Sequence, residues 1–404
     1  MTNNERIQAR IQRDKMRKQQ KRLERAKEFG TVEKVFTLQH LFISLQKRIR
    51  GTSWKGSVQA YISHAIVKNN RLKKRSLEGK LPENMVVRSM TLCERGKIRN
   101  IQMVDIESRV QQGCCCDNAL IPILQPTLIY DNPASTKGKG VSFARHRLEY
   151  QLQKLIRKNG SDFYVFTFDF KSFFDSIRHK LCFESMKRHF ISEPLISLIM
   201  KIIRIYKESR LPLLKNKEKR TAERTKLENM EGVGITLGSQ ISQVMALVAP
   251  NKIDHTIKDV KGIECFERYM DDGIMLHESK EVLLDVWDSI KTVAAMLGLK
   301  FNEAKTHIVK ATQGFTFLKI RYRITENGRI IKRITRSSIV RMRRKLKKFV
   351  SKVKDGAMLL DDVFNAVSAW LGCTKTARTY KARKRMLNLY NRLFHTYRMK
   401  GVKI

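Results

Sequence analysis

Three aspartates in this sequence have surroundings that suggest chemistry. Asp271 and Asp272 are adjacent in CFERYMDDGIMLHE, residues 265–278, where apolar and aromatic neighbours indicate strands on both sides. Asp169 ends FYVFTFD, residues 163–169, a β-branched and aromatic run that is typical of a buried strand. Burying one carboxylate is costly, and burying several is more so, unless cations lie between them. Two divalent ions held between such acids catalyse in-line phosphoryl transfer.

The order of the expected elements predicts how these acids meet. The strand that ends at Asp169 is followed by helices, a second strand, the turn with both adjacent aspartates, a third strand and another helix. This order predicts a split β-α-β arrangement, in which the end of the first strand and the turn lie side by side. Asp169 and Asp271 are therefore expected to be neighbours, although 102 positions separate them. Taken alone, an Asp-Asp pair is a common solvated turn, but the surrounding strands favour a metal site.

The charge of the chain indicates its class of partner. Among 404 residues, 82 Lys and Arg oppose 38 Asp and Glu, which gives a formal net charge of +44. Such a surface repels itself unless a polyanion neutralises it, and nucleic acid is the expected partner. An anionic membrane is the alternative, but the sequence has no run of 18 apolar residues and no signal-peptide pattern. We therefore expect a cytoplasmic protein without a membrane partner, and the sequence leaves its oligomeric state open.

The remaining segments predict a core with basic extensions. The 42% hydrophobic content allows two or three subdomains, and the consecutive cysteines 114–116 are expected to be small, reduced core residues rather than zinc ligands. Residues 5–29 predict a very basic helix, either a solvated or disordered arm or an RNA-binding arm. Residues 90–112 predict a strand pair that turns at Gly96. Residues 216–232 predict a polar loop or hairpin, and the chain from about residue 336 is helical and basic.

The motifs of the chain resemble those of reverse transcriptases, in the order that this family has them. RYMDDGIML resembles the Y-x-D-D signature, and FTFDFKSFFDSI resembles the first catalytic motif. GKIRNI and SRVQQ resemble the fingers, GITLGSQISQ the substrate-helix motif, LGLKFNEAKT the next motif and GFTFLKI the primer-grip hairpin. The match spans residues 90–325 and implies an α+β right-hand polymerase with a split β-α-β palm. The parts that it implies are a basic N-terminal arm (1–30), fingers with part of the palm (31–160), palm (161–325) and a helical basic thumb (326–404).

The resemblance also implies roles for the acids and their neighbours. Asp169, Asp271 and Asp272 match the catalytic carboxylates, with Asp169 and Asp271 as principal ligands of two Mg²⁺ ions, for which Mn²⁺ can substitute. Phe170, which follows Asp169, would add its backbone carbonyl as a ligand. Lys305, in NEAKT, matches a proposed general acid for the pyrophosphate. Taken alone, this lysine is an ordinary surface charge.

Four further residues match contacts to the nucleotide and the primer. Lys97 and Arg99 match fingers residues that grip the triphosphate, for which the planar guanidinium is suited. Phe174 falls at the family's steric-gate position, where an aromatic ring crowds a ribose 2′-hydroxyl and favours dNTPs. The alternative for Phe174 is an ordinary core residue. Tyr269 would pack under the primer terminus.

One motif indicates the branch of the family. Leu237 and Gly238, expected at the nucleotide site, open LGSQISQ (237–243), where retroviral and intron enzymes carry Q-G-x-x-x-S-P. Leucine in place of glutamine removes the usual polar contact. The pattern resembles bacterial non-retroviral enzymes of the diversity-generating, unknown-group, defence-associated and abortive-infection types.

The resemblance implies an RNA-directed DNA polymerase that uses dNTPs, an RNA template and a DNA primer, with the template in a dedicated structured non-coding RNA of antiphage defence. The alternatives are a diversity-generating reverse transcriptase, a template-independent DNA polymerase, a viral-type RNA polymerase and a non-catalytic maturase-like RNA-binding protein.

Overall fold

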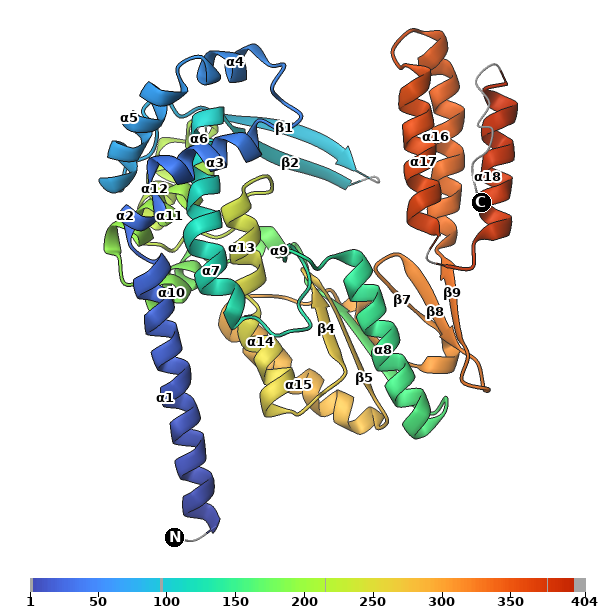
Figure 1. Ribbon diagram of the computed structural model, residues 1–404. Helices are drawn as coiled ribbons and strands as arrows, with labels where there is room; N and C mark the ends of the chain where they lie inside the picture. The colour runs from blue at the N-terminus through green and yellow to red at the C-terminus, as the bar shows by residue number, and fades with distance from the viewer. Residues whose placement is uncertain (1–2, 95–96, 215, 376, 396–404) are drawn as a thin grey trace.

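The computed structural model describes residues 3–94, 97–214, 216–375 and 377–395. A central sheet with helices around it lies between a mostly helical region and a separate bundle of three helices (Figure 1). These regions correspond in position to the palm, fingers and thumb of the predicted right-hand polymerase, and the mixed α and β content confirms the predicted fold class. No helix within the described ranges is both long and apolar enough to cross a bilayer.

The palm is built on a four-stranded sheet. Its strands are β3 (Tyr164–Asp169), β4 (Phe266–Tyr269), β5 (Asp272–His277) and β6 (His307–Lys310), in the order β4-β5-β3-β6. Every neighbouring pair is antiparallel, so β3 and β4 run parallel to each other with β5 between them. This topology is the split β-α-β unit that the order of the elements predicts.

Each face of the palm sheet has its own hydrophobic core. Phe166, Phe168 and Met275 point into the larger core, which is covered by helices and continues into the fingers. Val165 and Ile274 point to the other face, where they pack against a helix and a small second sheet. The covering elements are, on the first face, α13 (Gln240–Val248), α14 (Asn251–His255) and α15 (Lys280–Leu297), and on the second, α8 (Val141–Asn159), β7 (Phe315–Phe317), β8 (Ile320–Ile324) and β9 (Ile330–Ile334).

The fingers include the predicted strand pair, which projects from the helices around it (Figure 1). β1 (Val87–Glu94) pairs with β2 (Lys97–Val104) from end to end, while the predicted turn at Gly96 lies outside the described residues. Cys114, Cys115 and Cys116 are buried and free, as predicted for core residues. The helices around them are α2 (Val32–Val35), α3 (Leu38–Arg48), α4 (Gly56–Ile62), α5 (Ala65–Leu77), α6 (Ile106–Cys115), the π-helical turn η1 (Cys116–Leu120) and α7 (Ile121–Leu124).

The N-terminal arm is one helix, α1 (Asn3–Phe29), which projects away from the body of the molecule (Figure 1). Its last turns contact α7 and α10 (His179–His189), and Ala26 is buried there. Most of its other described side chains are exposed. The helix predicted from the sequence is therefore present, and what it binds stays a prediction.

Residues 216–232 differ from the predicted loop or hairpin, because they contain the helix α12 (Lys217–Glu228). The Asn216 side chain caps it by accepting a hydrogen bond from the Lys219 backbone N–H at 2.9 Å. Lys, Glu, Arg and Ala are good helix formers, and Leu227 supplies the one buried side chain that anchors the helix. The prediction was wrong because it required an apolar stripe. α12 follows α9 (Phe173–Ser176), α10 and α11 (Glu193–Glu208).

The C-terminal region is a bundle of α16 (Arg336–Lys354), α17 (Leu360–Thr374) and α18 (Tyr380–Leu393) with a core of its own. The helices were predicted correctly, but the region assigned to the helical thumb also includes β9. This strand pairs with β8 and so belongs to the sheet beneath the bundle. The exact limits of the four predicted parts stay predictions.

Candidate active site

The three aspartates meet at one edge of the palm sheet. Asp169 ends β3 and is the register partner of Asp272, the first residue of β5. Asp271 lies in the two-residue turn between β4 and β5, and its carbonyl accepts a hydrogen bond from the Phe170 N–H at 3.2 Å. The neighbours predicted from the sequence are therefore brought together. Their catalytic and metal-binding roles stay predictions.

The turn that carries Asp271 is held in a strained conformation. Met270 has a φ of 58°, in the left-handed region that a non-glycine residue adopts at a cost of about 1 kcal/mol or more. The Met270 carbonyl accepts a hydrogen bond from Nη1 of Arg268 at 2.8 Å. Arg268 is itself fixed by a fully buried, two-bond ion pair with Asp254, whose N···O distances are both 2.7 Å. Such strain persists only where the surrounding structure enforces it.

Sequence reasoning missed this Asp254–Arg268 pair. The available signal was an arginine directly before the Tyr-Met-Asp-Asp turn, in a strand whose flanks are apolar, because a buried arginine needs a carboxylate partner. The partner lies on α14 and cannot be identified from spacing alone.

The electrostatics of the acids are unfavourable without a cation. Burial raises the pKa of Asp271, and the charge of Asp169 adds to it, while Lys305 and Arg99 oppose the shift. The pKa of Asp272 is raised as well, mainly by burial and further by the charges of Asp271 and Asp169. Both carboxylates thus lie where negative charge is poorly compensated.

Lys305 lies in the short 3₁₀ turn η5 (Glu303–Lys305), and its ammonium forms an ion pair with Asp169. Burial alone lowers the pKa of Lys305, but Asp169, Asp272 and Asp271 together outweigh burial and raise it. The lysine predicted from the motif is therefore in contact with one of the acids. Its ammonium therefore partly neutralises the charge of the acids.

The acids have the donor atoms that suit a divalent ion, but they do not form a preorganised coordination site. Among the described residues, no three His, Cys, Asp or Glu side chains are arranged to hold a metal. The donors here are nevertheless hard carboxylate oxygens, which Mg²⁺ prefers. Burial first, and the charge of neighbouring acids in addition, raise the pKa of Asp271 and Asp272, and a divalent cation would relieve the repulsion among the acids. The residues present therefore fit the predicted ions by the chemistry of their donor atoms.

A pocket of about 510 Å³ opens beside the acids. Asp169, Asp271 and Lys305 line it, and so do Phe174 and Arg99. The pocket thus places the predicted gate residue and one predicted triphosphate contact in the same space as the acids. Leu237 and Phe170 complete the set of predicted residues on its wall.

The other predicted residues lie elsewhere or outside the described part. The side chain of Lys97 lies outside the described residues, and its backbone opens β2. Tyr269 is half-buried at the end of β4 and packs into the core on the α8 face of the sheet. Gly238 lies away from the acids, in a separate pocket of about 670 Å³ between the fingers and α13.

Aromatic packing fixes the backbone next to Asp169. The Phe170 ring is buried between Phe173 and Phe301, with ring centroids 5.3 and 5.0 Å apart. Its side chain is therefore part of the core, which leaves only its backbone carbonyl available to the pocket.

The loop before α13 packs closely against Gln102 of β2. The Leu237 carbonyl accepts a hydrogen bond from the Gln102 N–H of β2 at 3.2 Å. Gly238 has a φ of 116°, and a Cβ there would lie 2.6 Å from the Gln102 carbonyl oxygen. This close approach requires glycine.

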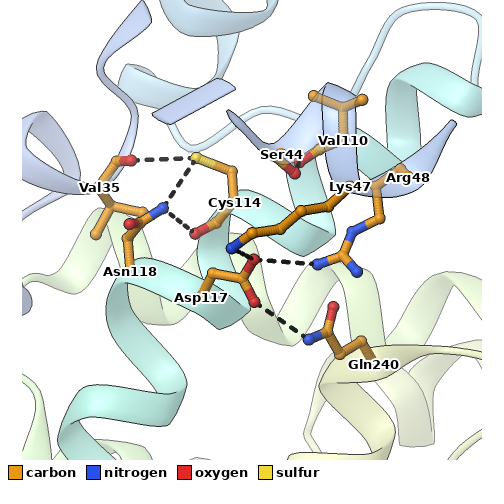
Figure 2. Close-up of polar contacts among 9 residues, drawn as sticks. All are labelled: Val35, Ser44, Lys47, Arg48, Val110, Cys114, Asp117, Asn118 and Gln240. Atoms are coloured by element: carbon orange, nitrogen blue, oxygen red, sulfur yellow. Dashed lines mark hydrogen bonds and ion pairs between the residues drawn. The ribbon is translucent and has the colours of Figure 1, made fainter. Parts of the chain in front are cut away.

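Asp117 of η1 fixes the start of α13 (Figure 2). Its carboxylate accepts hydrogen bonds from Lys47 at 2.9 Å and Arg48 at 3.4 Å on α3, and from Gln240 at 3.3 Å at the first residue of α13. These contacts join α3 and η1 to the first residue of α13, the helix that follows the loop with Leu237.

Comparison with known proteins places these features in a family. The family model described as "Reverse transcriptase (RNA-dependent DNA polymerase)" matches residues 87–322, more than half of the chain. No curated protein matches the chain.

Solved structures of telomerases are similar to this chain at low identity. Apo telomerase from Candida tropicalis truncated from the C-terminal domain is 16% identical, with 61% of this chain and 54% of that chain covered and a TM-score of 0.43. Telomerase from Candida albicans in complex with a TWJ fragment of telomeric RNA is 14% identical, with 78% and 56% covered and a TM-score of 0.44. A second apo telomerase from Candida tropicalis is 14% identical, with 78% and 64% covered and a TM-score of 0.39. The chain thus spans less than two thirds of each of these proteins.

Proposed function

Since the chain belongs to the reverse transcriptase (RNA-dependent DNA polymerase) family, we propose that it copies an RNA template into DNA by adding dNTPs to a primer 3′ end. The observation that carries the proposal is the meeting of Asp169, Asp271 and Asp272 beside a pocket that Phe174 and Arg99 also line. An acid cluster, a bulky ring and a guanidinium are what polymerisation of a deoxynucleotide needs in one space.

In this proposal the acids hold two Mg²⁺ ions, or Mn²⁺ in their place. Asp169 and Asp271 are the principal ligands, with Asp272 and the Phe170 carbonyl as additional donors. When bound, the ions would supply Lewis-acid chemistry, which lowers the pKa of the primer 3′-hydroxyl and stabilises charge on the phosphates. Lys305 forms an ion pair with Asp169, so its ammonium is close enough to the acids to donate a proton to the departing pyrophosphate.

The remaining side chains orient the nucleotide. Arg99, together with Lys97, binds the triphosphate from β2, because a guanidinium forms two parallel bonds to phosphate oxygens. Phe174 fills the space that a ribose 2′-hydroxyl would need, so a deoxyribose fits and a ribose does not. Tyr269 supports the primer terminus from the end of β4.

A narrower proposal concerns the source of the template: a dedicated, structured non-coding RNA that acts in bacterial antiphage defence. The motif LGSQISQ at residues 237–243 supports the bacterial branch, and the distribution of charge supports an extended RNA partner. α1 carries ten Lys or Arg against four Asp or Glu, and α16 carries nine against none. The two helices lie at opposite ends of the molecule (Figure 1), so one short duplex does not contact both.

Templated synthesis is tested with primers on RNA templates that differ in a single templating base. We expect Mg²⁺-dependent addition of only the complementary dNTP, and no addition in EDTA. Addition of any dNTP regardless of the template would identify a template-independent polymerase, and preference for rNTPs would identify an RNA polymerase. RNA binding without incorporation in Mg²⁺ or Mn²⁺ would identify a non-catalytic binding protein.

The RNA partner is tested by purifying the protein after co-expression with its native flanking locus. We expect one discrete RNA that competitor tRNA does not displace. An interface of 6–10 phosphate contacts loses roughly 10³–10⁵ in affinity between 50 and 200 mM salt. Deleting residues 1–29 should weaken this complex more than extension of a generic primer–template. A random mixture of RNAs, with both activities lowered equally, would contradict the dedicated partner.

A further inference from the structure

Two cations that the motifs do not account for line the pocket of the candidate active site. Lys207 lies near the end of α11 and Arg210 two residues after that helix, and both contribute to the wall that also includes Asp169 and Phe174. Neither side chain is fully exposed. In the part of the chain that the structure describes, neither has an ion-pair partner, whereas Arg204 on the same helix pairs with Glu208.

The Lys207 ammonium is held close to the backbone. A Cβ built on Gly234 would lie 2.8 Å from Nζ of Lys207, so the ammonium occupies the space that a side chain at this position would need. Burial lowers the pKa of Lys207, the charge of Asp175 opposes that shift, and Arg210 adds to it. A half-buried ammonium without a paired carboxylate is unfavourable unless an anion binds to it.

A second pocket of about 530 Å³ adjoins the first one at these two residues. Lys207 and Arg210 line both pockets, and α12 supplies the far wall of the second. Lys219, Glu223 and Lys226 lie at the helical spacing that puts them on one face of α12, and Lys226 pairs with Glu223 at 3.2 Å. This pocket therefore has four cations and one acid, and it shares Lys207 and Arg210 with the pocket beside the three aspartates.

We propose that Lys207 and Arg210, extended by Lys219 and Lys226, form a polyphosphate-binding subsite next to the catalytic acids. Its ligand is the triphosphate of the incoming nucleotide or the pyrophosphate that leaves it, which share the same chemistry. A polyphosphate fits better than a nucleic-acid backbone, because the subsite adjoins the space between Phe174 and Asp169, from which a nucleotide's phosphates extend. The subsite rests on the proposed polymerase function and gives it a second triphosphate contact, in addition to that of Arg99 on β2.

The variant Lys207→Met keeps the length of the side chain and removes its charge. We expect it to raise the KM for dNTP, the inhibition constant of pyrophosphate, or both, by about tenfold, with a smaller change in kcat. It should also weaken binding of inorganic tripolyphosphate, measured by calorimetry without metal, by a similar factor. Arg210→Gln should act in the same direction, and provides the test if Lys207→Met does not fold.

The helix α12 offers a matched control. Lys219 and Lys226 line the pocket, whereas Lys217 and Arg224 are exposed on the opposite face of the same helix. Lys219→Ala/Lys226→Ala should weaken tripolyphosphate binding several-fold, and Lys217→Ala/Arg224→Ala, which removes the same charge, should not. Equal effects of the two double variants would show a general charge effect and overturn the subsite.

The arms of the experiment separate the sources of the phosphate. A rise in KM identifies the incoming triphosphate, and a rise in the pyrophosphate inhibition constant identifies the product. If Lys207→Met changes neither constant nor tripolyphosphate binding, or changes only the Kd of primer–template, the subsite is wrong. A protein that binds tripolyphosphate through Lys207 but incorporates no templated dNTP would refute the polymerase function and leave the subsite standing.

Discussion

The palm buries two sets of acidic side chains, and their negative charges are compensated differently. Asp254 and Arg268 are fully buried and joined by two bonds of 2.7 Å, and the other guanidinium contacts go to backbone carbonyls of Leu247 and Met270. Asp169, Asp271 and Asp272 are less deeply buried as a group, and Lys305 is the one ammonium that pairs with them in the described structure. Four hydrogen bonds fix the Arg268 guanidinium in the first set, whereas Lys305 pairs with Asp169 alone in the second.

The difference separates an acid that supports structure from acids that can bind a ligand. A fully buried ion pair such as Asp254–Arg268 fixes the elements that it joins, because breaking it would leave a buried charge without a partner. In addition to burial, the charge of Asp169 raises the pKa of both Asp271 and Asp272, and an added cation would relieve this repulsion. The two sets are also connected, because Arg268 holds the Met270 carbonyl in the turn that carries Asp271.

Glu267, the residue before Arg268, shows a third way to bury an acid. It is fully buried on the other face of β4, and neither carboxylate oxygen has a hydrogen-bond partner among the described residues. Burial, with the charge of Asp131 in addition, raises the pKa of Glu267 to about 9. This acid is therefore neutral at pH 7, and it avoids the cost of a buried charge by keeping its proton.

Removing divalent ions should have the largest effect, a loss of dNTP incorporation. This loss should arise only at the proposed catalytic acids. EDTA should lower dNTP incorporation by about 10³-fold or more, because metal catalysis contributes several kcal/mol and each 1.36 kcal/mol is tenfold. Mg²⁺ should raise the Tm of the wild type, because an ion that binds only the folded state stabilises it. The same Mg²⁺ should leave the Tm of Asp169→Asn nearly unchanged. A metal-induced rise in Tm that persists in Asp169→Asn would place the ion elsewhere.

Breaking the structural pair should have the next largest effect, and on stability. Asp254→Asn leaves a buried guanidinium without its carboxylate, which costs about 3–5 kcal/mol of unfolding free energy. Urea unfolding measures this loss. The matched control is Asp259→Asn, an exposed acid in the next turn that pairs with His255, where the expected change is below about 1 kcal/mol. Similar losses in both variants would mean that the Asp254–Arg268 pair has no special role.

Glu267 predicts a dependence of stability on pH. Its folded pKa is raised above the ordinary value of 4.5, so between about pH 4.5 and 9 the folded state holds a proton that the unfolded state does not. Stability should therefore fall as pH rises through this window, by at most about 1.4 kcal/mol per pH unit from this group. Glu267→Gln should remove this contribution, which urea unfolding from pH 5.5 to 8.5 would detect. An unchanged slope would show that Glu267 is ionised in the folded protein.

Phe174 should give the smallest effect, on the choice of sugar. Phe174→Ala opens space beside the nucleotide, so the ratio of rNTP to dNTP incorporation, compared as kcat/KM, should rise by about tenfold. The ring lines the pocket and makes an edge contact with Phe173 at 5.7 Å between centroids. If the ratio does not move, Phe174 is a core residue and the selection of the sugar lies elsewhere.

The sequence predicts most reliably what local pattern and motif order determine. Asp169 and Asp271 could be placed together because two apolar strands and a turn have few possible arrangements. Lys305 and Phe174 could be placed at the same pocket only because their motifs resemble those of a family. α12 was missed, because its stability comes from helix-forming residues and a cap rather than from apolar periodicity.

Contacts between distant segments could not be predicted. Arg268 finds its carboxylate on α14, and Lys207 reaches the pocket because a loop 27 positions later has a glycine at residue 234. Both depend on how helices pack over the sheet, which no single segment encodes. β9 was likewise assigned to the thumb, because its pairing with β8 depends on a turn between two short, highly charged runs.

One measurement tests the account most directly: templated incorporation and unfolding free energy of Asp271→Asn, in the same preparation. The substitution removes a charge that its surroundings disfavour and keeps the shape of the side chain. We predict that incorporation on an RNA template falls by about 10³-fold or more, while the unfolding free energy is unchanged or slightly higher. Incorporation at the wild-type rate, or a loss that merely follows unfolding of the variant, would contradict the assignment of these acids as the catalytic centre.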